Sequence, residues 1–325
     1  MERKIRSKFL AVTCGEEEGV FWVSHERNHI AIEVELDVID FIDQFITPQI
    51  LNIKDLDEQK LYRLLTEIHF LQDKVQVESE SRDILNNWLN KFDKEIRWFR
   101  YCNVMVNYAA REQEPVKNIL NEILKIGQEL HRELLAFQQP IYILFLTPKE
   151  YRDLQIEFNI PSDISTFVDS RTLLIMDYES YFKKNNTRSF YPTVRHELIH
   201  ILFGQYAYYL PFWLEEGLCD YYSKKYRIDY LNYELKKEEL ISFVEIHSEK
   251  VNYIAQLSSF NSIQHVFYPQ VVSFTDFLFR TLTEECVWNI IRKSSILRDF
   301  FDVLEKNYGI TLIDLQFEWE TFIKK

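Results

Sequence analysis

The sequence is poor in glycine and cysteine, and it has no long hydrophobic run. Only 6 glycines occur in 325 residues, and they form no phosphate-binding loop, so a nucleotide-binding fold is not expected. The 4 cysteines are far apart and form no C-x-x-C pair, which argues against a disulfide framework and a cysteine zinc site. No segment approaches the roughly 20 apolar residues of a membrane span, and the basic N-terminus lacks the apolar run of a signal peptide. These absences predict a cytoplasmic protein without a membrane partner.

Basic residues are also scarce relative to acidic ones. The chain has 38 Lys and Arg against 51 Asp and Glu, a formal net charge of -13. Because affinity for phosphates comes from Lys and Arg, we expect no nucleic-acid partner. Hydrophobic residues make up 46% and charged residues 27%, which is the composition of a globular chain. The length allows one large domain or two modest ones, each with its own core.

The first part of the chain predicts a small unit of strands and helices. Three segments alternate apolar and polar residues, as half-buried strands do: 9–13, 20–24 and 29–34. A helix follows and stops before Pro48, and a second helix runs from its N-cap, Asp55, to Leu71. His25 and His29 are four residues apart but lack acidic company, so both are expected at the surface.

The remainder predicts a short mixed sheet followed by helices. Strands are expected at 96–108, 141–146, 166–168 and 172–176. Helices are expected at 115–136, 149–158, 226–247, 269–281, 284–292, 296–308 and 311–324. A polar break near residue 80 sets the predicted boundaries: an N-terminal unit at 1–80, a linker helix at 81–95 and a second domain at 96–325. The fold class that follows is α+β, with a helical C-terminal lobe.

The segment from Thr193 to Gly204 contains an H-E-x-x-H motif, made by His196, Glu197 and His200. Residues four apart lie on one face of a helix, so both imidazoles can bind one metal ion. Glu197 is one position round from His196 and can hold a water molecule over the same site. The flanking residues are apolar and predict a buried helix that Gly204 ends, which favours a real site over a chance match.

A second helix is expected at 212–222, and two of its three acidic residues are candidates for the site. A catalytic zinc ion takes three protein ligands, and Glu216 is the best candidate for the third. Asp220 lies four residues later on the same face. That spacing suits a carboxylate that accepts the free ring N–H of His196 or His200 and so orients the ligand.

The two segments His-Glu-Leu-Ile-His and Trp-Leu-Glu-Glu-Gly-Leu-Cys-Asp-Tyr resemble the zinc site of the gluzincin metallopeptidases, in particular the small peptidase-MA-like families. The resemblance covers about residues 95–325. It implies that Zn²⁺ is held by His196, His200 and the glutamate directly before glycine, Glu216. Cys219 stands where the family usually has alanine, and we expect it to be a small buried side chain and not a ligand.

The resemblance implies further roles for two segments. The strand before the zinc helix in gluzincins is the sheet edge along which a substrate backbone is laid, and the matching residues are Leu173, Leu174, Ile175 and Met176. Tyr268 opens a segment that in related gluzincins begins with a catalytic tyrosine. We therefore expect Tyr268 to stabilise the oxyanion of the tetrahedral intermediate.

These features predict a zinc-dependent peptidase with Glu197 as general base, acting on a dedicated peptide or protein. An endopeptidase is favoured, because the G-x-M-E-N-type motif of gluzincin aminopeptidases is absent. The sequence does not predict the oligomeric state. One alternative is a peptide-binding protein that has the metallopeptidase fold but no catalytic activity.

A second alternative concerns residues 1–80, whose element order faintly resembles the winged-helix-like peptide-recognition domains of ribosomal peptide maturation enzymes. The chain would then be a leader-peptide-processing protease, with this unit recruiting the substrate. The same segment would otherwise simply pack on the rest of the chain for stability.

Overall fold

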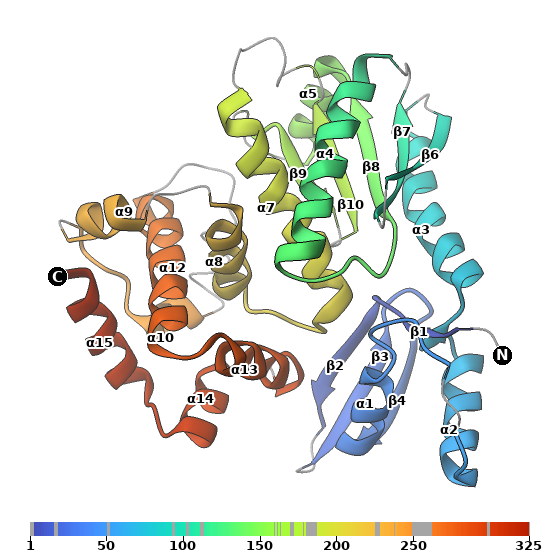
Figure 1. Ribbon diagram of the computed structural model, residues 1–325, viewed down its shortest axis with the longest axis horizontal. Coiled ribbons are helices and arrows are strands. Elements are labelled where there is room, and N and C mark those ends of the chain that lie inside the picture. The colour runs from blue at the N-terminus through green and yellow to red at the C-terminus, as the bar shows by residue number, and fades with distance from the viewer. Residues whose placement is uncertain are drawn as a thin grey trace. The chain divides into compact units, whose positions relative to one another are not determined.

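The structure is a computed structural model that describes residues 3–15, 19–50, 53–92, 95–101, 104–110, 114–158, 160, 162, 164–169, 172–177, 179, 187–224, 228–236, 238–248, 262–297 and 300–324. The fold class is α+β, as predicted (Figure 1). The chain forms two compact units. The first comprises residues 1–146, 168–176 and 201–208, and the second comprises 147–167, 177–200 and 209–325. This division differs from the boundary expected at residues 81–95, because the first unit continues well past it.

The first unit begins with strands and helices, of which three strands and the first two helices were predicted; two short strands were not, and the helix expected at 81–95 begins and ends earlier. These elements are β1 (Ile5–Arg6), β2 (Leu10–Cys14), β3 (Val20–His25), β4 (Ile30–Glu35), α1 (Leu36–Asp43), α2 (Leu56–Glu67), β5 (Leu71–Gln72) and α3 (Lys74–Leu89). Strands β2, β3 and β4 form an antiparallel sheet in that order, and β1 pairs with β5. Asp55 is the N-cap of α2, as predicted. Its side chain accepts hydrogen bonds from the backbone N–H groups of Asp57 and Glu58.

Side chains along β3 point alternately to the two faces of the sheet, and this alternation decides which of them are buried. Phe21 and Val23 face the core, whereas Trp22 between them is 41% exposed. His25 shares the inner face and is fully buried, with its Nε2 3.0 Å from Ser7 Oγ. The expectation of a surface His25 was therefore wrong, because the alternation that starts at Phe21 continues to the end of the strand.

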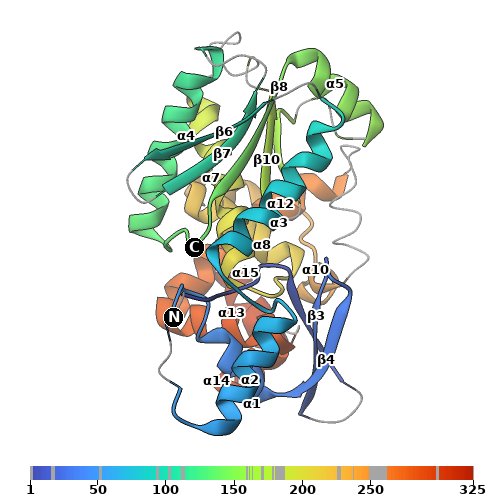
Figure 2. The ribbon, with the colours of Figure 1, turned by 90° about the vertical axis from the view of Figure 1, so that its right-hand side faces the viewer.

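The second sheet is mixed, as predicted, and has five strands in the order β6-β7-β8-β10-β9. Its elements are β6 (Glu95–Tyr101), β7 (Val104–Ala110), β8 (Ile141–Leu146), β9 (Thr166–Asp169) and β10 (Leu173–Asp177), with α4 (Glu114–Glu133) between β7 and β8. Strands β6 and β7 are antiparallel, whereas β7 and β8 are parallel and need the crossover through α4. Figure 1 shows α3 and α4 on opposite sides of this sheet, and Figure 2 shows its strands side by side. The single strand expected at 96–108 is in fact the hairpin β6–β7; residues 102–103 lie outside the described residues.

The position of β10 in the sheet corrects one prediction. Leu173, Leu174, Ile175 and Met176 are fully buried, and β10 lies between β8 and β9. Both of its edges are therefore occupied, so it is not the edge strand that we expected to pair with a substrate. Within the described residues, the edge on this side of the sheet is β9.

The remaining elements are helices. They are α5 (Pro148–Glu157), α7 (Thr187–Tyr206), α8 (Phe212–Ser223), α9 (Ile228–Leu235), α10 (Phe243–His247), α12 (Ser262–Thr281), α13 (Glu284–Leu297), α14 (Phe300–Tyr308) and α15 (Leu312–Lys324). Helix α7 continues through Gly204, which was expected to end it, because backbone hydrogen bonding carries on to Tyr206. The single helix predicted at 226–247 is divided into α9 and α10, and α12 begins before Pro269. In the described part of the chain, none of these helices combines the length and the apolar character that a membrane crossing requires.

An aromatic cluster forms the core around α8 in the second unit. Trp213 of α8 is fully buried, and its ring lies 5.3 Å from that of Phe300 and 5.5 Å from that of Phe301. Phe274 of α12 lies 5.6 Å from the same ring. Burying large aromatic side chains stabilises the fold strongly, so Trp213 fixes the first turn of α8.

Candidate metal centre

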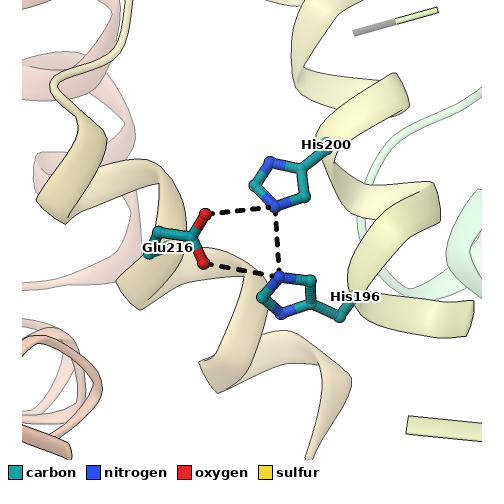
Figure 3. A group of neighbouring side chains, drawn as sticks. All are labelled: His196, His200 and Glu216. Carbon is teal, nitrogen blue, oxygen red and sulfur yellow. Dashed lines mark hydrogen bonds and ion pairs between the residues drawn. The ribbon is translucent and has the colours of Figure 1, made fainter. Parts of the chain in front are cut away.

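Two helices bring three potential ligands to one point. His196 and His200 lie one turn apart on α7, and their Nε2 atoms are 3.1 Å from each other. Glu216 of α8 places one carboxylate oxygen 3.5 Å from His196 Nε2 and the other 3.6 Å from His200 Nε2, as Figure 3 shows. The structure thus brings these three residues together, and their role as metal ligands stays a prediction.

The spacing and chemistry of these atoms suit a bound metal ion, and zinc stays the predicted one. Zinc ligands lie about 2.0–2.2 Å from the metal, so neighbouring atoms of a tetrahedral site are roughly 3.3–3.5 Å apart. The three residues offer ligand atoms that all lie within 4.8 Å of one another. Two imidazoles and one carboxylate are also a donor set that zinc uses in hydrolases.

The outer nitrogen of each imidazole contacts a carboxylate. His196 Nδ1 lies 2.8 Å from Asp220 Oδ1, although the ring N–H does not point squarely at the oxygen. His200 Nδ1 lies 2.9 Å from Glu215 Oε1. A carboxylate at Nδ1 favours the tautomer whose Nε2 lone pair is free for a metal, and it makes that nitrogen a stronger ligand.

Asp220 was predicted to contact one of the histidines, and the structure assigns it to His196. The role of Glu215 was missed. Neighbouring residues on a helix point about 100° apart, so Glu215 and Glu216 cannot both face the metal. That rule was available from the Glu-Glu pair in the sequence and already implied a different partner for Glu215.

The carboxylates give the site an affinity for positive charge. Burial alone would lower the pKa of His196, but Asp220 and Glu216 raise it to about 10. The pKa of His200 is likewise raised, since Glu215 and Glu216 outweigh the effect of burial. A divalent cation would supply positive charge between the imidazoles and Glu216 and would leave both imidazoles neutral and available as ligands.

Glu197 and Cys219 lie in the same acidic surroundings. Burial raises the pKa of the Cys219 thiol well above its usual value, and the nearby carboxylates, Glu197 among them, raise it further. The thiol is therefore protonated, and a protonated thiol is a poor metal ligand. Glu197 is half-buried on α7 next to His196 and does not belong to the group of three ligands.

Gly217 explains how closely α8 can approach α12. A Cβ atom at this position would come within 2.8 Å of the Val271 carbonyl oxygen of α12. Only glycine allows this approach, which is why a glycine follows Glu216 directly. Gly217 and the buried Trp213 together hold α8 in place, and α8 carries Glu216.

Tyr268 lies on α12, the helix that packs against α8. Its half-buried ring is 6.5 Å from the ring of Phe212, which begins α8. It is also 5.4 Å from the ring of Phe267. The role of its hydroxyl group as an oxyanion donor stays a prediction.

Removing either outer carboxylate should weaken metal binding. We expect Asp220→Asn and Glu215→Gln each to lower zinc affinity by roughly 10- to 100-fold, because each variant loses the charge that orients one imidazole. Competition with a chromophoric chelator measures this change, and Glu305→Gln, at an exposed position on α14, is the matched control. An unchanged affinity in either site variant would show that its carboxylate is only structural.

Comparison with known proteins assigns no family to the chain. No protein-family model matches it, and no curated protein matches its sequence. The function therefore has to be argued from the residues of the site, and the likeness to gluzincins rests on the motifs of the sequence.

Proposed function

We propose that the protein is a cytoplasmic zinc-dependent endopeptidase that hydrolyses peptide bonds in a dedicated peptide or protein. The observation that supports this proposal best is the meeting of His196 Nε2, His200 Nε2 and the Glu216 carboxylate, with Glu197 next to His196 on α7. A cytoplasmic location agrees with the free thiols of Cys14, Cys219 and Cys286.

In this proposal each residue of the site has its own role in the hydrolysis. A zinc ion held by His196, His200 and Glu216 would polarise the scissile carbonyl as a Lewis acid and would lower the pKa of a water molecule toward about 7. Glu197 accepts the proton of that water and then delivers it to the leaving amine. Asp220 and Glu215 hold the two imidazoles, so that their Nε2 atoms stay directed at one point.

In this proposal a peptide substrate pairs with the sheet along β9 and not along β10. In the described residues, β9 has β10 on one side and no strand on the other. An extended peptide that adds to such an edge gains main-chain hydrogen bonds, while side-chain pockets determine its sequence preference.

A peptide-binding protein without activity is the rival proposal. Glu197 argues against it, since a binder has no need of a general base. The test is cleavage of a peptide library by the purified protein, with and without a chelator, together with metal analysis. We expect about one equivalent of zinc and cleavage that the chelator abolishes; a zinc-loaded protein that cleaves nothing would favour the rival.

Tyr268→Phe tests the proposed oxyanion donor. We expect kcat to fall by roughly 100-fold, about 3 kcal/mol of transition-state stabilisation, with KM and zinc content little changed. The phenyl ring keeps the packing against Phe212, so the change isolates the hydroxyl group. Wild-type kcat in this variant would make Tyr268 a packing residue.

A leader-peptide-processing protease is a narrower version of the same proposal. It is favoured by the antiparallel sheet β2-β3-β4, in which β4 is an edge strand with half-buried Ile30, Ile32 and Val34 along it. Such an edge suits strand addition. Amide hydrogen exchange on the Glu197→Gln variant tests it, because a recruited substrate should protect residues 30–35, and unchanged exchange there would exclude this site.

A further inference from the structure

Arg195 is a buried charged residue directly before the first metal ligand. Only 1% of its surface is exposed. Its Nε donates to the Tyr222 carbonyl oxygen at 2.8 Å, and its Nη1 donates to the Tyr191 hydroxyl oxygen at 3.3 Å. Burying a guanidinium group is costly unless it is hydrogen-bonded. The two hydrogen bonds of Arg195 offset this cost, and they suggest that its charge has a role inside the fold.

The Tyr222 carbonyl lies at the C-terminal end of α8, which is Phe212–Ser223. The last four carbonyl groups of a helix have no partner within it and carry the negative end of the helix dipole. Arg195 supplies both a donor and a positive charge at this end. The Ser223 hydroxyl group donates to the Asp220 carbonyl oxygen at 3.0 Å in the same turn.

Two neighbouring residues of α7 thus bind two residues of α8. His196 contacts the Asp220 side chain at 2.8 Å, and Arg195 contacts the Tyr222 carbonyl at 2.8 Å. One contact alone would let α8 turn about a single point, whereas two contacts in adjacent residues fix its position along α7. Glu216 lies six residues before Tyr222, roughly 9 Å along the helix axis. Because a helix is stiff over this length, a shift at Tyr222 displaces Glu216 as well.

We propose that Arg195 is a positioning residue for the metal centre: it holds α8 against α7 so that Glu216 meets the imidazoles of His196 and His200. This inference rests on the metal site of the proposed function but not on the peptidase activity. It also differs from the part played by Gly217, which sets the distance of α8 from α12.

The test measures metal binding by the full chain, not catalysis. Arg195→Met keeps most of the apolar volume and removes the donors and the charge; we expect roughly 10- to 100-fold weaker zinc binding. Arg195→Lys keeps the charge but not the forked donors, and we expect roughly 3- to 10-fold weaker binding. In the cobalt-substituted protein, the visible absorption spectrum of Arg195→Met should change, because Glu216 is displaced from the metal.

Controls separate this effect from general destabilisation. Arg132→Met removes an exposed arginine of α4 whose Nε donates to the Gln128 carbonyl oxygen, and it should leave the affinity and the cobalt spectrum unchanged. Wild-type affinity and spectrum in folded Arg195→Met overturn the proposal; if that variant does not fold, wild-type affinity in Arg195→Lys overturns it. A wild-type protein that binds no zinc overturns the metal site itself, whereas one that binds zinc without cleaving peptides refutes only the peptidase.

Discussion

Replacing Glu197 by glutamine is expected to lower peptide hydrolysis by roughly 10²- to 10⁴-fold while the fold and the metal are retained. Glutamine has the same shape as glutamate but cannot accept the proton of the attacking water. The candidate ligands are His196, His200 and Glu216, so the change leaves all three in place. Steady-state cleavage rates, circular dichroism and metal analysis together measure the effect.

His200→Ala is the matched comparison for this variant. It removes one of the two imidazoles, and it should therefore lose most of the zinc as well as the activity. Glu197→Gln and His200→Ala are then equally inactive but differ in metal content. Near-normal turnover by Glu197→Gln would overturn the mechanism, and full zinc retention by His200→Ala would overturn the assignment of the ligands.

The part of the site that depends on local spacing could be predicted from the sequence. Helical periodicity places His196 and His200 on one face of α7, and Glu216 and Asp220 on one face of α8. Each pair needs only the geometry of its own helix. Glu215 was missed although helical geometry already gave it a direction different from that of Glu216. Arg195 was missed because no spacing rule points to its partner, the Tyr222 backbone carbonyl of another helix.

The difference between local spacing and contacts between distant segments also explains which predictions about the sheets were right. The strand β8 was predicted at its observed limits, because a continuous apolar run between two prolines is a local signal. The edge role of β10 was wrong because the order of strands depends on pairing between distant segments. The predicted strand at 96–108 failed for a related reason, since its two halves pair with each other in the hairpin β6–β7.

The second large effect is expected from removing residues 1–82, which should leave a chain that neither folds nor binds zinc. Residues 1–82 belong to the same compact unit as residues 201–208 at the end of α7, so the truncation cuts through one unit. Within the removed segment, Arg6 Nη1 lies 2.7 Å from Asp43 Oδ1, and both side chains are 3% exposed. Arg6 also donates to the Gln205 carbonyl oxygen at 3.3 Å, and the Tyr208 hydroxyl group donates to Asp43 at 2.7 Å. Gln205 lies in the last turn of α7, the helix that carries His196. The N-terminal segment therefore contacts the last turn of α7, the helix that carries the two candidate histidine ligands.

A single substitution in the full chain measures how much this buried pair contributes. Leaving one member of a buried ion pair without its partner costs about 3–5 kcal/mol, a large part of the roughly 5–15 kcal/mol that stabilises a typical domain. We expect Asp43→Asn alone to destabilise the full chain by about 3–5 kcal/mol in urea unfolding, because the Arg6 charge stays buried. Lys60→Met removes an exposed pair with Asp57 and should cost less than about 1 kcal/mol.

The truncated chain also decides between the two roles of the N-terminal segment. If a chain that begins at Asp83 is insoluble or binds no zinc, the segment is an integral part of the fold. If that chain folds, binds zinc and cleaves short unrelated peptides at the full-length rate but loses its preference for the native substrate, the segment is a detachable recruiting domain. We expect the first result, because Gln205 and Tyr208 would lose their partners Arg6 and Asp43 at the end of α7. Recruitment along β4 would then have to be tested in the full chain, where the sheet β2-β3-β4 is intact.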